Sequence, residues 1–351
     1  MPQHPPEYTP IDLTGPALAG LARALGDPPG RGPVLAIGVF DGLHLGHRSL
    51  LEAGLDMARR RGGPLGVLTF WPHPEQVLRR DGGAQLLLLS TLEEKVRLLG
   101  LAGAEKILVL RFTREAAGME AEEFVSRALV AGLAPVGIVI GFNFTFGRGG
   151  RGDPALLRRL GQAVGIEVAV HPAVRVDRDV VSSSAVREAL AQGDVERAGL
   201  LLGRPYSLCG PVVSGAGRGR KLGFPTANVA FPAELASPAH GVYVCSVLPA
   251  SAATLRPDLG VALPGVANIG IRPTFAGPPV ARPNPGLEVH VLAGAPPTYG
   301  DEIRVFFHRR LRPERRFAGS GQLAEQIARD RAKAGTFFGL GSLGPSSKSG
   351  G

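Results

Sequence analysis

The chain has 351 residues, of which 44% are hydrophobic and 20% are charged, so it is globular and too long for one ordinary core. We expect two domains of roughly 150 residues each. The formal net charge of +9 comes from 39 basic residues mixed with 30 acidic ones. No block of like charges forms an arm, so the charge alone does not indicate a nucleic-acid partner.

The cysteine content and the apolar runs indicate where in the cell the protein is expected. Cys209 and Cys245 are the two cysteines, which excludes a disulfide framework, and they lack the spacing of a zinc site. The Pro-rich first residues do not follow the pattern of a signal peptide, and no apolar run approaches the roughly 20 residues that span a bilayer. We therefore expect a cytoplasmic protein with no membrane partner.

Short apolar runs alternate with amphipathic stretches from residue 34 to about residue 170. The predicted strands are Val34–Phe40, Leu65–Phe70, Lys106–Leu110, Val136–Phe142 and Ile166–Val170. The predicted helices are Arg48–Arg61, Leu92–Leu99, Ala121–Ala131 and Pro154–Ala163. Alternation at this spacing is typical of βαβ units, and continuous apolar runs fit strands that are buried on both faces. The sequence predicts a parallel sheet with helices on both sides.

The strongest local motif, GVFDGLHLGH at 38–47, follows the first predicted strand and opens the first helix. Ligands of parallel sheets bind beyond the carboxyl ends of the strands, and a helix N-terminus there favours phosphate. Two imidazoles in this Gly-rich turn, His44 and His47, can donate hydrogen bonds to phosphate oxygens that gain charge when an α-phosphorus is attacked. Ordinary surface histidines at a helix cap are the weaker explanation.

Two further segments are expected at the same edge of the sheet. Residues 182–187, SSSAVR, open a predicted helix, and Arg187 follows one turn later, which suits a triphosphate. Taken alone, an ordinary helix cap explains this segment better. The GFNFTFG segment at 141–147 offers aromatic rings and the amide of Asn143 to a ring ligand, although core packing explains the phenylalanines equally well. Residues 147–152 satisfy GxGxxG but lie too late in the domain for a dinucleotide fingerprint.

After helices predicted at Ser184–Gln192 and Val195–Leu202, the character of the chain changes near residues 200–204. Short alternating runs without helical spacers predict an antiparallel barrel or sandwich. The predicted strands are Tyr206–Val213, Gly241–Leu248, Val266–Ile271, Leu287–Leu292 and Glu302–Phe307, and one helix is predicted at Gly321–Arg331. The Gly/Ser-rich residues from Leu340 onward are expected to lack regular structure.

A second motif, GAGRGRKLGFPTAN at 215–228, combines a flexible basic loop with a rigid turn. The loop can cover phosphates with backbone N–H groups and positive charge. Thr226 and Asn228 lie two residues apart on an extended segment and offer hard oxygens, which Mg²⁺ prefers. A basic surface loop would explain the glycines and arginines alone, but not the attached PTAN step.

Glu288 and His290 alternate with Leu287, Val289 and Val291 and therefore share one face of a predicted strand. A carboxylate beside a primary alcohol can accept its proton during phosphoryl transfer. By pattern alone, an ordinary solvent-facing pair is the better explanation of these two residues.

These motifs resemble a known family. GxFDGxHxGH at 38–47, TFxPHP at 69–74, GFNFTFG and SSSxxR are similar to the adenylyltransferase half of bacterial bifunctional riboflavin kinase/FAD synthetases, which belong to the HxGH nucleotidyltransferases. Trp71 departs from that pattern, because the family more often has an acidic residue there. GRKLGFPTAN at 219–228, ANIGIRPT at 267–274 and LEVHVL at 287–292 resemble the riboflavin kinase domain.

The resemblance implies a Rossmann-like HxGH domain followed by a six-stranded antiparallel barrel with a terminal helix. It also implies Thr226 and Asn228 at Mg-ATP, and Glu288 as the base that acts on the ribityl hydroxyl. We place an N-terminal extension at 1–30, the FMN adenylyltransferase domain at 31–202, the riboflavin kinase domain at 203–335 and a disordered tail at 336–351.

The site residues are assigned accordingly. The expected catalytic residues are Glu288, His44, His47 and Arg187. ATP and its phosphates are assigned to Gly38, Phe40, Asp41, Gly42, Gly46, Ser182, Ser183, Gly217, Arg220, Lys221, Gly223 and Pro225. The flavin is assigned to Phe70, Asn143 and Phe146, and a divalent cation, Mg²⁺ or another, to Thr226 and Asn228.

The expected function is phosphorylation of riboflavin to FMN with one ATP and adenylation of FMN to FAD with a second ATP. The partners are these small molecules and not nucleic acid, and self-association is left open. One alternative is an HxGH adenylyltransferase for another phosphorylated acceptor, such as pantetheine or nicotinate phosphate. A nucleic-acid-binding protein is a second alternative, which only the basic charge supports.

Overall fold

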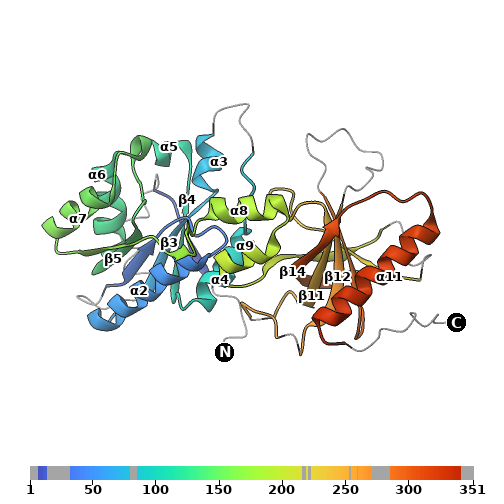
Figure 1. Ribbon diagram of the computed structural model, residues 1–351. Coiled ribbons are helices and arrows are strands. Elements are labelled where there is room, and N and C mark those ends of the chain that lie inside the picture. Colours follow the sequence, from blue (N-terminus) through green and yellow to red (C-terminus); the bar gives the residue numbers. More distant parts are fainter. Residues whose placement is uncertain are drawn as a thin grey trace. The chain divides into compact units, whose positions relative to one another are not determined.

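The computed structural model describes residues 7–13, 32–79, 85–215, 219, 223–252, 254–258, 260–270 and 285–340. The chain divides into two compact units, Met1–Ser183 and Ser184–Gly351, which are described separately (Figure 1). Within these ranges, none of the helices has the length and the apolar character that crossing a membrane requires.

The first unit contains a six-stranded parallel sheet in the order β1-β4-β3-β2-β5-β6. Its strands are β1 (Tyr8–Ile11), β2 (Val34–Ile37), β3 (Leu65–Trp71), β4 (Lys106–Arg111), β5 (Gly137–Gly141) and β6 (Glu167–His171). The five strands expected from apolar runs are confirmed. The edge strand β1 was missed because three of its four residues are exposed, so it carries no apolar run.

Helices cover both faces of this sheet, as predicted. On one face, Leu35, Leu68 and Ile138 pack into a core with η2 (Phe124–Leu133) and α7 (Pro154–Ala163). On the other, α2 (Leu45–Arg61) packs against β2, β3 and β5, and α4 (Leu92–Leu101) packs against β4. This two-sided burial explains why the strands read as unbroken apolar runs.

The remaining elements of the first unit are short. The helix expected at 121–131 is divided into α6 (Ala121–Glu123) and η2, which is a π-helix. Two helices of four or five residues, α3 (Pro74–Leu78) and α5 (Arg114–Ala117), and a hairpin of β7 (Arg175–Val176) and β8 (Asp179–Val180) were not predicted. Elements this short show no hydrophobic periodicity.

Apart from its first residue, α8 (Ser183–Gln192) belongs to the second unit. This unit continues with α9 (Val195–Leu202) and a closed barrel in the order β10-β13-β12-β11-β14-β9. The strands are β9 (Tyr206–Val213), β10 (Ala227–Val229), β11 (Gly241–Pro249), β12 (Leu263–Gly270), β13 (Gly286–Val291) and β14 (Glu302–Pro313). All neighbouring pairs are antiparallel, which confirms the six-stranded antiparallel barrel.

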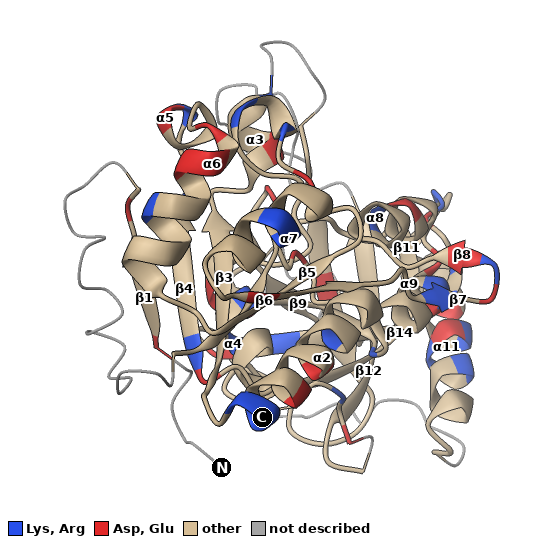
Figure 2. Ribbon diagram, turned by 90° about the vertical axis from the view of Figure 1, so that its left-hand side faces the viewer, with Lys and Arg blue, Asp and Glu red and all other residues tan. Residues whose placement is uncertain are grey.

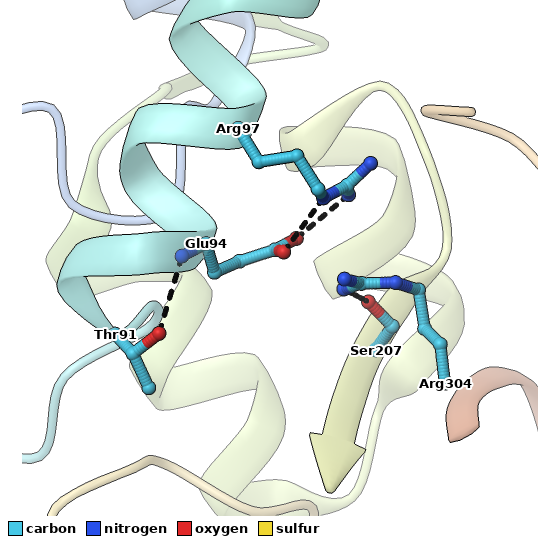
Figure 3. Close-up of polar contacts among 5 residues, drawn as sticks. All are labelled: Thr91, Glu94, Arg97, Ser207 and Arg304. Atoms are coloured by element: carbon cyan, nitrogen blue, oxygen red, sulfur yellow. Dashed lines mark hydrogen bonds and ion pairs between the residues drawn. The ribbon is translucent and has the colours of Figure 1, made fainter. Parts of the chain in front are cut away.

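Alternation along the strands fills the barrel with apolar side chains. Tyr243, Ala267 and Leu287 come from three neighbouring strands, and each is fully buried. Successive side chains in a strand point to opposite faces. The residues that alternate with these buried ones along each strand therefore lie on the outer face. Arg304 of β14 is 3% exposed and donates to the Ser207 hydroxyl of β9 at 3.4 Å (Figure 3).

The C-terminal helix α11 (Ser320–Phe337) packs against β12 and β11. It extends six residues beyond the range predicted for it, and its last two residues enter the range 336–351 that was expected to be a tail. Ala334, near this end of the helix, is fully buried. Residues 341–351 lie outside the described ranges. Arg312 of β14 is bonded to Asp330 of the helix at 2.9 Å, and the Asp330 side chain is 3% exposed.

This ion pair generates a stability prediction. Replacing Asp330 with Ala leaves the largely buried Arg312 guanidinium without the carboxylate that pairs with its charge, so we expect the free energy of unfolding to fall by about 3 kcal/mol. Amide hydrogen exchange along α11 should also accelerate. The matched control is Glu325→Ala in the same helix. The Glu325 side chain is 72% exposed and its pair with Arg329 should contribute less than about 1 kcal/mol. Equal losses from both variants would contradict this view of α11.

Candidate active sites

The strand order places the first candidate site at the middle of the parallel sheet. β2 lies between β3 and β5: the chain runs from β2 to β3 and β4 on one side, and then crosses to β5 and β6 on the other side. In such sheets the crevice for ligands opens outside the carboxyl ends of the strands at this point of reversal. The loop 38–44 follows β2, and the 141–147 segment leaves β5, so both predicted segments start from this edge.

The loop 38–44 has an unusual backbone. Phe40, Gly42 and Leu43 have φ angles of 53°, 77° and 42°. At Gly42 a Cβ atom would lie 2.7 Å from Leu89, so only glycine fits this turn. Phe40 is fully buried, with its ring 5.1 Å from that of His47. Its side chain therefore supports the loop, and only its backbone could approach a nucleotide.

His44 and His47 are brought together at the start of α2. His44 is the N-cap residue, and its Nδ1 accepts a hydrogen bond from the His47 backbone N–H at 3.2 Å. The two rings stack with centroids 3.6 Å apart. Because Nδ1 acts as an acceptor, the neutral His44 ring carries its proton on Nε2 and can donate from there. Gly46 leaves room for this arrangement, since a Cβ atom there would lie 3.2 Å from the His44 ring.

The position of the Asp41 side chain differs from the one that the predicted phosphate contact requires. Its side chain is 2% exposed, and its carboxylate accepts from Leu89 N at 3.0 Å and from Ser90 N at 3.1 Å. The Ser90 hydroxyl donates to the same carboxylate at 3.2 Å and accepts from Gly42 N at 3.2 Å. Asp41 thus fastens the loop to residues 89–90 instead of facing solvent.

Some of the other residues predicted for this site are bonded to the loop 38–44 or lie within it. Ser183 donates from its hydroxyl to the Asp41 carbonyl at 2.9 Å, which joins the SSSAVR segment to the loop 38–44. Thr69 donates to the Val39 carbonyl at 3.0 Å, and Gly38 N donates to Leu68 O at 3.1 Å, so β3 also supports the loop. Ser182 precedes α8, and Arg187 lies half-buried within it.

Two residues that were assigned to the flavin lie in the hydrophobic core. Phe70 is 8% exposed and meets Phe112 edge to face at 6.0 Å. Phe146 is 7% exposed and lies 5.8 Å from the Phe144 ring. For the aromatics of the 141–147 segment, core packing was left open as an alternative to a flavin contact. The structure places Phe146 in the core. Asn143 is exposed and remains accessible at this edge.

The second candidate site lies on the outer face of the barrel. Asn228 of β10 pairs with Glu288 of β13, and Glu288 pairs with Asn268 of β12 on its other side. Directly opposite residues in antiparallel strands project to the same face, with Cβ atoms about 5 Å apart. Asn268 was not among the predicted site residues, because only the register of three strands reveals that it lies beside Glu288.

Glycines make room around the predicted cation ligands. A Cβ atom at Gly215 would lie 2.1 Å from the Asn228 amide nitrogen, and one at Gly219 would lie 3.1 Å from the Thr226 hydroxyl. Gly223 has a φ angle of 83°, and Pro225 follows in the exposed turn before β10. Gly217, Arg220 and Lys221 lie outside the described residues.

His290 has a structural contact that the sequence did not indicate. Its ring is 8% exposed, and its Nδ1 is 2.8 Å from the carbonyl oxygen of Pro225. Burial lowers its pKa and the Arg331 charge lowers it further, while the bond to Pro225 opposes both. A neutral imidazole therefore donates from Nδ1 at pH 7 and anchors the turn that precedes Thr226. His290 is a buried partner of this turn and not a solvent-facing residue.

Comparisons with known proteins agree with this division. A family model described as FAD synthetase matches residues 28–185, and one described as riboflavin kinase matches residues 202–338. The bifunctional riboflavin kinase/FMN adenylyltransferase of Escherichia coli (strain K12) is 40% identical over 317 residues, which cover 90% of this chain and 96% of that protein. The protein of the same name from Bacillus subtilis (strain 168) is 36% identical over 307 residues, which are 87% of this chain and 92% of that protein.

A crystal structure described as a macrolide-efflux protein from Streptococcus pneumoniae has a TM-score of 0.74 to this chain at 30% identity. The match covers 87% of this chain and 93% of that protein. Both family models and the full-length relatives point the same way, and the chain belongs to the family of bifunctional riboflavin kinase/FMN adenylyltransferases.

Proposed function

We propose that this chain phosphorylates riboflavin to FMN at the barrel and adenylates FMN to FAD at the parallel sheet, with one ATP for each step. The observation that supports this most directly is that each matched family falls on one unit that has its own group of polar residues. The stacked His44 and His47 belong to the first unit, and the row of Asn228, Glu288 and Asn268 belongs to the second.

In the kinase reaction, Glu288 accepts the proton of the ribityl hydroxyl as that oxygen attacks the γ-phosphorus of ATP. The half-buried carboxylate stands on a strand paired on both sides, so its position is rigid. The glycine-rich residues before Phe224, with Arg220 and Lys221, supply backbone N–H groups and positive charge to the phosphates. Gly217, Gly223 and Pro225 are proposed as further phosphate contacts of that segment.

Thr226 and Asn228 fit a divalent cation. Their side chains offer a hydroxyl and an amide oxygen, and the close approach of Gly219 and Gly215 leaves a cradle that a Cβ atom would fill. Mg²⁺ is usually held by one or two protein groups together with substrate phosphates and water, which matches this small donor set. Such an ion would neutralise charge on the transferred phosphoryl group.

In the adenylylation, an FMN phosphate oxygen attacks the α-phosphorus of ATP and pyrophosphate leaves. His44 and His47 donate hydrogen bonds to oxygens that gain charge, and the N-terminus of α2 adds its partial positive charge. Arg187 and the hydroxyls of Ser182 and Ser183 bind the leaving phosphates. Gly38, Gly42 and Gly46 let the backbone approach ATP, and Asn143 is proposed as a flavin contact.

The same proposal covers the setting of the protein. We propose a cytoplasmic enzyme whose partners are riboflavin, FMN and ATP, with self-association left open. An HxGH domain that serves another phosphorylated acceptor would not account for the riboflavin kinase match at 202–338. Basic and acidic residues are mixed along helices such as α2 and α11, which gives no support to a nucleic-acid-binding surface there (Figure 2).

Separate sites predict separable losses. His47→Ala should reduce the formation of FAD from FMN by about 100-fold or more, because it removes a donor to the charged transition state. It should leave the formation of FMN from riboflavin unchanged. Glu288→Ala should do the reverse, with a loss of about 100-fold in FMN formation. Both rates are measured by chromatography of the flavins, with each substrate supplied separately.

The matched controls are His240→Ala and Glu325→Ala, which remove an exposed histidine and an exposed glutamate of the barrel unit and should affect neither rate. If His47→Ala or Glu288→Ala removed both activities from a protein that keeps its thermal midpoint, the two-site assignment would be wrong.

Metal removal gives a further prediction. After dialysis against a chelator, FMN formation should be lost and should return when Mg²⁺ is added. Thr226→Val removes one oxygen donor at nearly constant volume, so the Mg²⁺ concentration for half-maximal rate should rise by about tenfold. The Mg²⁺ dependence of FAD formation should not change in this variant. An unaltered Mg²⁺ dependence of FMN formation would exclude Thr226 as a ligand.

A further inference from the structure

Lys95 is a buried cation in the first unit to which the reactions above assign no task. It lies in the first turn of α4 and is 1% exposed. Its ammonium donates to the Phe70 carbonyl at 3.3 Å and lies 5.3 Å from the centre of the Trp71 ring. Burial of an ammonium is unfavourable unless another interaction compensates for it.

Asp41 is the charged group that acts on Lys95: burial lowers the pKa of the lysine, and the Asp41 carboxylate raises it. This turn carries two carboxylates: Glu93 is exposed, and Glu94 is bonded to Arg97 at 2.8 Å and 2.9 Å (Figure 3). The turn itself is fixed, because Thr91 caps α4 by accepting from Glu94 N at 3.2 Å (Figure 3). The Lys95 ammonium therefore lies at the carboxyl end of β3, on a capped turn, and interacts electrostatically with Asp41 of the loop 38–44.

The interactions of Lys95 and Asp41 connect the segments that surround the stacked histidines. Asp41 binds Leu89 and Ser90 through its carboxylate and Ser183 through its carbonyl. Lys95 adds the carboxyl end of β3 at Phe70. The loop that carries His44 is thus hydrogen-bonded to residues 68, 69, 89, 90 and 183. Lys95 acts on this network through the charge of Asp41 and through the Phe70 carbonyl at the end of β3.

We infer that Lys95 is a positioning residue for adenylyl transfer, whose buried ammonium acts with Asp41 to hold the loop 38–44 so that His44 and His47 face the nucleotide. This inference rests on the adenylylation proposed above. Lys95 itself touches no substrate, since it is 1% exposed. A loop in which Phe40, Gly42 and Leu43 all have positive φ angles needs such support from outside.

The lowered pKa of Lys95 distinguishes a role in positioning the loop from a role in stabilising the fold. Burial lowers the pKa of Lys95 to about 8. Because this folded-state pKa is below the value of about 10.5 in an unfolded chain, the protonated form opposes folding at neutral pH. That unfavourable contribution is relieved as the pH rises from about 8 toward 10.5. Replacement by a neutral side chain should consequently not reduce stability at pH 7.

The test compares Lys95→Met with Lys106→Met, a control that removes a lysine from the amino end of β4. In Lys95→Met we expect kcat for FAD formation from FMN and ATP to fall by about tenfold or more, with KM for ATP changed by less than about threefold. FMN formation in the same protein should be unchanged, and the thermal midpoint at pH 7 should be unchanged or higher. In the wild type and in Lys106→Met, FAD formation should decline above about pH 8, and this decline should be absent in Lys95→Met.

Two results would overturn the inference. One is a Lys95→Met protein with the FAD formation rate and pH profile of Lys106→Met. The other is a lowered thermal midpoint with FMN and FAD formation reduced together, which would mean a structural role. If Lys95→Met does not fold, Ser90→Ala provides the second variant, because it removes one hydroxyl from the same network. FAD formation in Ser90→Ala should slow severalfold with FMN formation unchanged, and an unchanged rate would again overturn the inference. A wild-type protein that makes no FAD would instead reject the proposed function.

Discussion

The pairing of the strands by backbone hydrogen bonds determines where each unit can place the polar side chains of a site. In the parallel sheet, strands β2, β3 and β5 are paired on both sides and covered on both faces, so the polar groups that can meet a ligand lie in the loops beyond the strand ends. In the closed barrel no strand has a free edge and the interior is filled with apolar side chains, so polar groups lie on the outer face. The two proposed sites follow from this difference. The adenylylation residues are carried by loops at the carboxyl ends of strands, and the kinase residues by a row across three strands.

The same constraint explains how each site is made rigid. A loop has no ladder of its own, so the loop after β2 depends on contacts from elsewhere in the unit, including the hydroxyls of Thr69 and Ser90 and the carboxylate of Asp41. The row on the barrel needs no such support, because Asn228 and Glu288 belong to the ladder itself. Only the turn before β10 requires an anchor, which His290 provides.

Much of this arrangement could be predicted from the sequence. The unbroken apolar runs of the first unit and the alternating runs of the second indicated the two architectures, and the paired histidines after the first long apolar run indicated where the nucleotide would bind. The edge strand β1 and the three-residue β10 were missed, since one is largely exposed and the other is too short to alternate. The assignment of Asp41 to phosphate also differs from its buried position, because a motif does not reveal which of its side chains turn inward. Asn268 and Lys95 depend on strand register and on burial, which the sequence alone does not contain.

The central claim, that one chain carries both activities in sequence, is tested most directly by incubating the purified protein with riboflavin, ATP and Mg²⁺ and separating the flavins by chromatography over time. The account predicts that FMN appears first and that FAD then forms at its expense. Unchanged riboflavin would contradict the kinase assignment of the barrel. Accumulation of FMN without FAD would contradict the assignment of the histidine loop to FMN adenylylation.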